Sequence, residues 1–297
     1  MGISAHSRGA LSFAAAMLIS ASIGLVVSQL TLGAIEIVFF RCAIGAICLL
    51  AYVLLFERRG WCLDPSELRY TLIAAVFLVF NWVFLFSAFK ATSITVAVSI
   101  YYLAPIFITL YGMLVLKEGT SAMKIATIAL AFAGALLVSG LADRQALALS
   151  VSGALYALLA ALLYAGLVIL AKNIKRAKPA HTALLQTVTG TLILLLFIDL
   201  SWQQLLTLNW SALLLIGAVH TAAMYILFFY GVANSPVSLV ALLGFIDPMI
   251  AVLLDFTLLD ASLSWQQWLG AGLIFAAISL KVAQEQRRDN AAYATNS

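Results

Sequence analysis

Charged side chains are scarce in this sequence. They make up 9% of the 297 residues, whereas 64% of residues are hydrophobic and the mean hydropathy is +1.10. Soluble domains are roughly 45 to 50% apolar, so a water-soluble fold could not bury this much apolar surface. The few charges gather between apolar stretches of roughly 20 residues, the length that crosses a hydrocarbon core about 30 Å thick. The composition predicts a polytopic membrane protein.

Cysteines and soluble catalytic signatures are also missing or few. Cys42, Cys48 and Cys62 show no metal-ligand spacing, so neither a disulfide nor a metal is assigned. No phosphate-binding glycine loop with its lysine occurs, which argues against ATP hydrolysis by this chain. We expect no cofactor, no nucleic-acid partner and no enzymatic activity. The net charge of +4 is explained by membrane orientation rather than by an acidic partner.

Ten apolar stretches can be distinguished, and none alternates with the period of two that β-barrel strands show. With the amino terminus inside the cell, 13 of the 16 lysines and arginines fall on the cytoplasmic side; Lys90 and Arg144 fall outside and Arg41 lies within a span. This bias follows the positive-inside rule. We predict an all-α protein of the plasma (cell inner) membrane with cytoplasmic termini and ten transmembrane helices, which begin near Ala10, Ile35, Tyr70, Ile94, Met123, Gly153, Ala180, Trp210, Val237 and Leu263.

The chain divides at residues 142–150 into two similar sets of five stretches. Segments 91–105 and 233–248 both begin with small and polar residues and end at a proline. An acidic residue follows each, Glu118 in one half and Asp260 in the other. An odd number of spans makes the second set enter the membrane from the opposite side. Inverted repeats of this kind are typical of secondary transporters, whose substrate site lies near the midplane between the repeats.

Several of these segments together resemble a known family. Arg41 within 39–45, the 91–105 segment with Glu118, and Pro248 with Asp260 resemble the drug/metabolite transporter superfamily in its ten-span EamA-type branch, over residues 9–283. The resemblance implies two five-helix repeats, 9–140 and 151–283, and export or exchange of small metabolites such as amino acids. Two residues depart from the family pattern. Glutamate is more common at the position of Asp260, and many members have an apolar residue at the position of Asp247.

Asp247 is the first candidate for a binding or coupling residue. An ionised carboxylate at membrane depth costs roughly 2.5 to 3.5 kcal/mol on insertion scales. If the fourth and ninth spans pack together, helical spacing brings Asp247 toward Tyr101 and Tyr102. An ionised Asp247 would bind a substrate ammonium, and a protonated one would couple transport to a proton. The alternative is a structural carboxylate paired with His220.

His220 is the second titratable candidate, because the pKa of a histidine lies within the physiological range. It is equally well interpreted as an interhelical hydrogen-bond donor. By repeat symmetry the counterparts of His220 are Asn81 and Trp82. We interpret Asn81 as a residue that packs helices together. Four aromatic side chains are interpreted either as the lining of a substrate pocket or as packing residues. They are Trp82, Tyr101, Tyr102 and Phe245.

Two prolines and one arginine are assigned to hinges or gates. Pro105 and Pro248 lack a backbone N–H for the carbonyl four residues earlier, that of Gly244 in the second case, so a kink or hinge is expected at each. Arg41 is interpreted either as a structural cation, paired locally with Glu36 or reaching toward the outer surface, or as an outer gate. Both interpretations are favoured over direct substrate contact.

These observations favour a secondary transporter that works by alternating access at a midplane site, with a small-molecule substrate and protons as a possible coupling ion. Ten spans enclose a complete pathway, so a monomer suffices. The alternative is an intramembrane enzyme that acts on a lipid or isoprenoid, for which Asp247 and His220 are the candidate pair.

Overall fold

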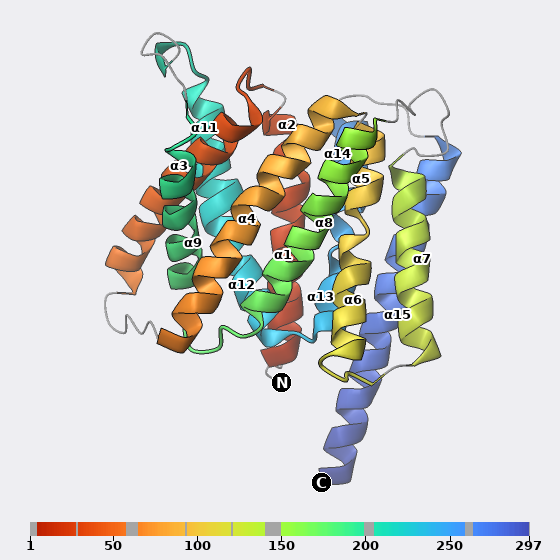
Figure 1. The fold of residues 1–297 in the computed structure, drawn as a ribbon. Coiled ribbons are helices and arrows are strands. Elements are labelled where there is room, and N and C mark those ends of the chain that lie inside the picture. The colour runs from red at the N-terminus through yellow and green to blue at the C-terminus, as the bar shows by residue number, and fades with distance from the viewer. Residues whose placement is uncertain are drawn as a thin grey trace.

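The structure is a computed structural model that describes residues 5–27, 29–57, 65–92, 94–119, 121–139, 150–198, 205–258 and 264–296. Every regular element in these ranges is a helix and none is a strand. The helices stand side by side in one bundle, and both chain ends lie at the same end of it (Figure 1). The prediction of an all-α polytopic membrane protein is confirmed.

The first half of the chain forms helices α1 to α7, with two interruptions inside predicted spans. Their bounds are α1 Ala5–Ala21, α2 Ile23–Val27, α3 Ala34–Phe56, α4 Pro65–Ala91, α5 Ile94–Tyr101, α6 Ala104–Leu114 and α7 Ala122–Val138. The second half forms α8 Val151–Ala171, α9 Pro179–Leu194, α11 Trp210–Gly217, η2 Ala218–Ala223, α12 Met224–Asn234, α13 Val237–Leu243, α14 Ile246–Leu258 and α15 Trp265–Asn296. The element η2 is one turn of π-helix that joins α11 to α12.

Among the described residues, six helical segments are long and apolar enough to cross a membrane. They are 7–27, 34–56, 65–91, 96–114, 151–171 and 210–234, and shorter apolar helices cover 122–138 and 237–251. Each of the ten predicted stretches overlaps a helix, but four of them, over α7, α9, α13 with α14, and α15, are not among these six segments. The exact count of ten spans and the side of the termini stay predictions.

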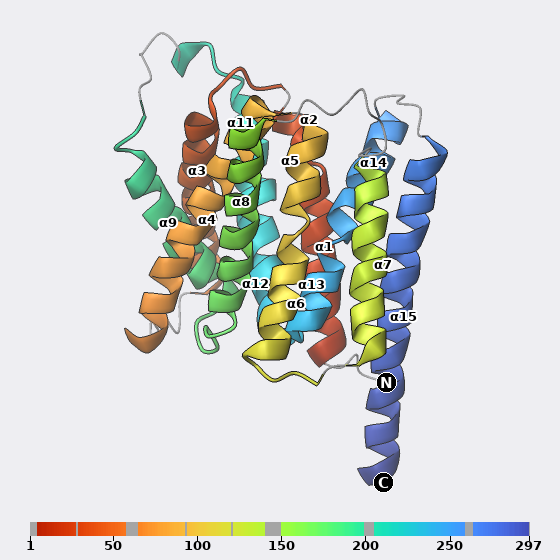
Figure 2. The ribbon, with the colours of Figure 1, turned by 45° about the vertical axis from the view of Figure 1, so that its right-hand side comes forward.

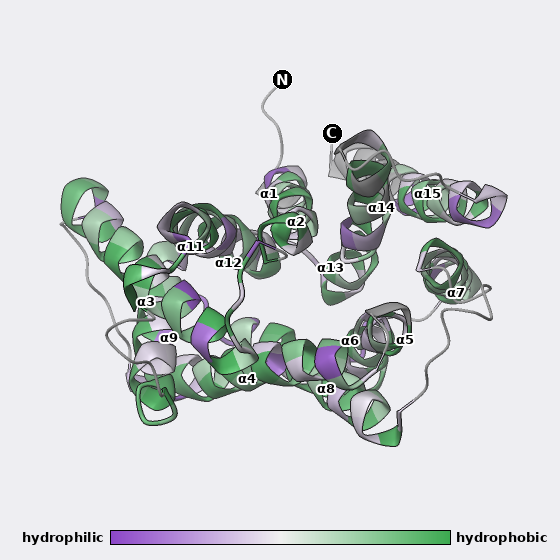
Figure 3. Cartoon of the chain, turned by 90° about the horizontal axis from the view of Figure 1, so that it is seen from above, coloured by the Kyte–Doolittle hydropathy of each residue, from purple (hydrophilic) through white to green (hydrophobic). Residues whose placement is uncertain are grey.

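Each half packs mainly against the other half. The most extensive contacts join α4 to α8, α7 to α15, α1 to α12 and α3 to α9. Figure 3 shows the helices from above, with α3, α4 and α8 in one row and α1, α12 and α13 facing them. Small residues permit the closest approach: a Cβ on Gly134 of α7 would lie 2.7 Å from the Gly270 carbonyl oxygen of α15.

Proline breaks the fourth and ninth predicted spans at matching places. The first break lies between Tyr101 and Ala104, just before Pro105, and the second lies between Leu243 and Ile246, just before Pro248. Figure 2 shows α5 continuing into α6 after the first break, beside α13. Proline cannot donate the helical hydrogen bond and its ring opposes the preceding turn. The expected kinks are therefore full interruptions, and Gly244 lies within the second.

Candidate functional site

The two broken helices meet at Gly244 and Phe245, within three residues of Asp247 in the sequence. Helix α6 packs against α13, and a Cβ on Gly244 would lie 3.8 Å from Cγ of Pro105. The rings of Tyr102 and Phe245 are 6.4 Å apart. The Ser20 side chain of α1 hydrogen-bonds the Asp247 carboxyl. Its oxygen Oδ1 is buried and has no hydrogen-bond partner.

Asn81 of α4 lies beside Tyr101 in the same region. Its Nδ2 donates to the Tyr101 hydroxyl over 3.3 Å and to the Ala160 carbonyl oxygen over 2.7 Å. Its Oδ1 is buried without a partner. The side chain is 1% exposed. Its bond to Ala160 joins α4 to α8, which agrees with the packing interpretation. The free Oδ1 adds a second unused acceptor near Tyr101.

Arg41 of α3 is buried, with 4% of its surface exposed. Its Nε donates to Thr221 Oγ1 over 3.1 Å, and one terminal nitrogen donates to the His220 carbonyl oxygen over 3.0 Å. The guanidinium lies 3.7 Å from the centroid of the Trp82 ring, a cation–π contact. The interpretations that paired Arg41 with Glu36 or extended it to the outer surface are wrong, because packing against the second half keeps the guanidinium inside.

The partners of Arg41 lie on the π-helical turn. A π-helix widens the backbone by one residue per turn and is often found at functional sites. Thr221 donates its hydroxyl to the Ile216 carbonyl oxygen over 2.9 Å, five residues back, and so accepts from Arg41 with the same atom. Nothing in the apolar sequence of this stretch signals the extra residue in the turn.

His220 has partners of its own and does not contact Asp247. Its Nε2 lies 2.9 Å from Ser22 Oγ, and its Nδ1 lies 3.3 Å from the Leu215 carbonyl oxygen. The bond to Ser22 connects the eighth predicted span to the first, as expected of an interhelical hydrogen bond. The pair of Asp247 with His220, on which both the structural alternative and the enzyme alternative relied, is not formed.

Aromatic rings connect the Arg41 region to the Asp247 region. Centroid distances are 5.5 Å for Trp82 and Tyr225, 5.4 Å for Tyr225 and Phe228, 6.3 Å for Phe228 and Tyr164, and 5.8 Å for Tyr164 and Tyr101. Tyr225 and Phe228 were missed at the sequence level. The available signal was the spacing of Tyr225, which is one helical turn after Thr221 on the same face.

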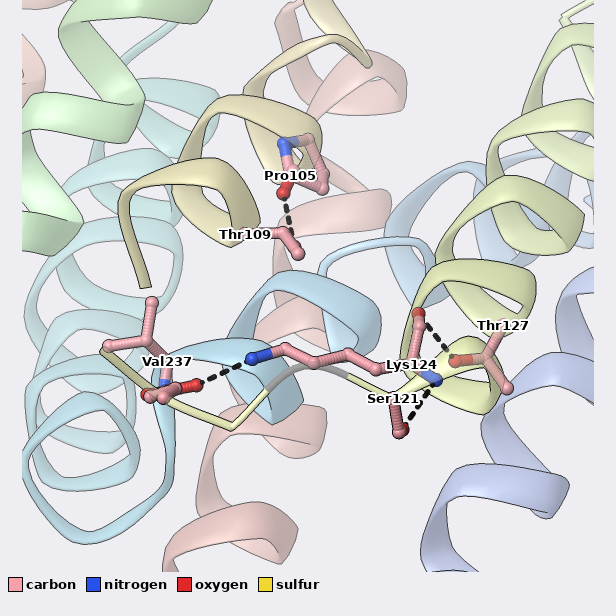
Figure 4. A network of polar contacts seen from close by, with 7 residues as sticks. Pro105, Thr109, Ser121, Lys124, Thr127 and Val237 are labelled. Atoms are coloured by element: carbon pink, nitrogen blue, oxygen red, sulfur yellow. Dashed lines mark hydrogen bonds and ion pairs between the residues drawn. The ribbon is translucent and has the colours of Figure 1, made fainter. Parts of the chain in front are cut away.

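Three glutamates lie at the end of the bundle that carries the chain ends, which we call the basic face. It comprises the α6–α7 and α8–α9 connections with the starts of α4 and α13, and it includes Lys124, Lys172 and residues 175–178. Glu118 Oε2 lies 3.0 Å from Lys124 Nζ, and Glu118 Oε1 accepts from the Val237 backbone N–H over 3.2 Å. Figure 4 shows Lys124 and Val237 approaching one another from α7 and α13.

The electrostatics of the basic face follow from these contacts. Burial alone would raise the pKa of Glu118, but the hydrogen bond and charge of Lys124, with bonds from Val237 and Ser238, lower it overall. Burial lowers the pKa of Lys172 to about 8, with Lys175 acting in the same direction and Glu118 against it. Lys172 Nζ donates to the Ser235 carbonyl oxygen. Both groups therefore connect the start of α13 to neighbouring elements.

Glu67, at the start of α4, holds the α8–α9 connection. Its carboxylate accepts from the consecutive backbone N–H groups of Lys175, Arg176 and Ala177 over 2.9 to 3.2 Å. Glu57, at the end of α3, has Oε2 3.3 Å from His181 Nε2, but this oxygen accepts no hydrogen bond. Neither glutamate was predicted from the sequence. Among the acidic residues, Asp260 lies outside the described residues.

The EamA-like transporter family is matched twice, by residues 7–140 and by residues 151–282. The chain belongs to this family. It is thus a multi-pass membrane transporter of the drug/metabolite transporter superfamily.

Two similar proteins come from Bacillus subtilis (strain 168). The "uncharacterized transporter YxxF" is 33% identical over 290 residues, which cover 96% of this chain and 92% of that protein. The "uncharacterized transporter YwfM" is 30% identical over 225 residues, covering 74% and 75%. A crystal structure with 20% identity has a TM-score of 0.78 and covers 95% of this chain and 99% of its own chain. At that identity the likeness supports the fold alone.

Proposed function

We propose that this EamA-family member is a secondary transporter that exports or exchanges a small metabolite, such as an amino acid, by alternating access between two inverted five-helix repeats. The double family match supports repeats close to 9–140 and 151–283. The matching breaks before Pro105 and Pro248 support them further, because discontinuous helices near the midplane form the substrate sites of many transporters.

The observation that carries this proposal is the state of Asp247. Its Oδ1 is buried and accepts no hydrogen bond. Buried polar groups are nearly always satisfied, and exceptions call for a functional explanation. A substrate ammonium or a coupling proton would supply what this oxygen lacks. The charge of Asp247 acts on both Tyr101 and Tyr102, which makes them candidates for the same ligand.

The basic face supplies a mechanism for alternation. Glu118 and Glu67 belong to the first half, and they bind Val237 and residues 175–177 of the second half. If positive charge marks the cytoplasmic side, these bonds close the bundle toward the cytoplasm. Rocking of the halves about the breaks at Pro105 and Pro248 would break and remake the bonds as the site is exposed to each side in turn.

Transport into proteoliposomes tests the proposal. The purified chain is reconstituted, and uptake of a panel of labelled amino acids is measured with and without a pH gradient. Saturable uptake that the gradient accelerates indicates proton coupling, and saturable uptake that ignores the gradient indicates a facilitator. Asp247→Asn should abolish uptake or remove its response to the gradient. Glu36→Gln, the same chemical change on α3, should preserve both.

Two results would contradict the proposal. The first is an Asp247→Asn variant that transports like the wild type at every pH. The second is the absence of uptake for amino acids and for nucleotide, sugar and drug-like metabolites in turn. Product formation from a lipid in detergent, where vectorial transport cannot occur, would favour the enzyme alternative.

A further inference from the structure

Arg41 is a buried cation that no carboxylate of the described residues neutralises. A guanidinium carries five N–H donors, and the two hydrogen bonds of Arg41 go to neutral acceptors, Thr221 Oγ1 and the His220 carbonyl oxygen. Trp82 covers one face of the guanidinium. No carboxylate of the described residues forms an ion pair with it. Removal of a charge from water is unfavourable unless a partner compensates for it, so the remaining donors of Arg41 suit an anionic ligand.

Asp247 presents the opposite charge, from the other half of the chain. Charges on both Asp247 and Arg41 act on Tyr101. The two charges do not satisfy each other: Asp247 is bonded to Ser20 and leaves Oδ1 unused. A substrate that carries both charges would find a cation in the first half of the chain and an acceptor in the second.

Aromatic rings link the surroundings of Arg41 to Tyr101. The rings of Trp82, Tyr225, Phe228, Tyr164 and Tyr101 follow one another with centroid distances of 5.4 to 6.3 Å. Such a surface accepts apolar parts of a ligand and excludes water, which strengthens both charge contacts. The Asn81 Oδ1, also buried without a partner, offers a further acceptor on the side of Tyr101.

We propose that Arg41 binds the carboxylate of a zwitterionic substrate whose ammonium is held by Asp247. This inference rests on the proposed function and gives Arg41 a direct role in specificity. One zwitterion neutralises both buried charges at once, whereas an amine leaves Arg41 uncompensated and a carboxylic acid leaves Asp247 uncompensated. Guanidinium binds carboxylate through two parallel hydrogen bonds, which selects it over other acceptors.

Competition assays in proteoliposomes test this role. Uptake of each of the twenty labelled amino acids is measured first. For each one transported, the competitors are the unlabelled amino acid, the amine that lacks its carboxylate and the acid that lacks its ammonium. For the wild type, the amino acid should compete at least tenfold better than either analogue. In Arg41→Gln its advantage over the amine should disappear, while its advantage over the acid remains.

Matched variants separate this role from folding. Arg69→Gln makes the same change at an exposed arginine of α4 and should leave the preference unchanged. Arg41→Lys retains the charge without the paired donors, so the preference should be weakened but not lost. Monodispersity and thermal stability in detergent are measured for each variant. If Arg41→Gln does not fold, the wild-type competition and Arg41→Lys decide the question.

The outcomes distinguish the inference from the proposed function. If the wild type transports no amino acid, amine or carboxylic acid, the amino-acid form of the proposed function fails and the inference fails with it. If amino acids are transported but amines compete equally well, or if Arg41→Gln keeps the wild-type preference, the inference alone is overturned.

Discussion

Glu67 and Glu118 of the basic face differ from the charges around Asp247 in how far the protein itself satisfies them. Glu67 accepts four hydrogen bonds from three consecutive backbone amides, and Glu118 is bound by Lys124 and Val237. Asp247 and Asn81 each retain a buried oxygen without a partner, and Arg41 has no ion pair with any described carboxylate. Natural proteins depart from full satisfaction mainly at functional sites. Under the proposed function, the basic face serves folding and closure and the interior serves ligand binding.

Asp247→Asn is the variant with the largest expected effect. A hydrogen bond to a charged group contributes about 1.5 to 3 kcal/mol, so uptake at limiting substrate should fall by about tenfold to a hundredfold. The melting temperature in detergent should stay the same or rise, because the oxygen that is unused in the fold contributes nothing to stability. A large fall in melting temperature would instead place Asp247 with the structural carboxylates.

Glu67→Gln should have the converse effect. The amide replaces one acceptor oxygen with a donor that faces backbone N–H groups, and Glu67 is 7% exposed. Loss of a buried, charged acceptor destabilises by about 3 kcal/mol. Thermal or denaturant unfolding in detergent measures the loss, with Glu36→Gln as the control. If the variant is as stable as that control and only transport is lost, the comparison between the two regions is broken.

Glu118→Gln should destabilise less, by about 1.5 kcal/mol, because the side chain is 24% exposed. The wild type carries a matching pH signature. The pKa of Glu118 is lower in the folded protein than its ordinary value of 4.5. Its contribution is therefore complete above pH 4.5 and is lost as the pH falls below that value. Unfolding measured from pH 7 to pH 3 should show a smaller acid loss for Glu118→Gln than for the wild type.

Lys172→Met should give the smallest change, and its pH signature lies in the alkaline range. Because the pKa of Lys172 is about 8 in the folded protein against an ordinary 10.5, the unfolded chain binds more protons between these values. Stability of the wild type should therefore rise with pH from 8 to 10.5. We expect the rise to stay below about 1 kcal/mol, since water partly screens this group. Lys172→Met should remove the rise, and a variant that kept it would assign it to another group.

Local signals in the sequence predicted the parts of the site that depend on backbone chemistry. Pro105 and Pro248 marked the two breaks, and the alignment of segments 91–105 and 233–248 placed them at matching positions. The approach of Asp247 to Tyr101 followed from helical spacing once those spans were assumed to pack. Long-range partners were not predictable in this way. For Arg41 the sequence indicates a local pair with Glu36 or a position at the outer surface. Glu36 is the candidate partner because it is the nearest acidic residue in the sequence.

Composition and period by themselves determined that this chain is an all-α membrane protein with two similar halves, since apolar length and proline position act on each segment independently of the rest. Tertiary structure alone decided which charges are satisfied. Arg41 meets Thr221 180 residues away, and Glu67 meets the amides of residues 175–177 more than 100 residues away. Packing of α3 and α4 against the second half sets these contacts, because a buried charge binds whichever groups the neighbouring helices bring within hydrogen-bond reach.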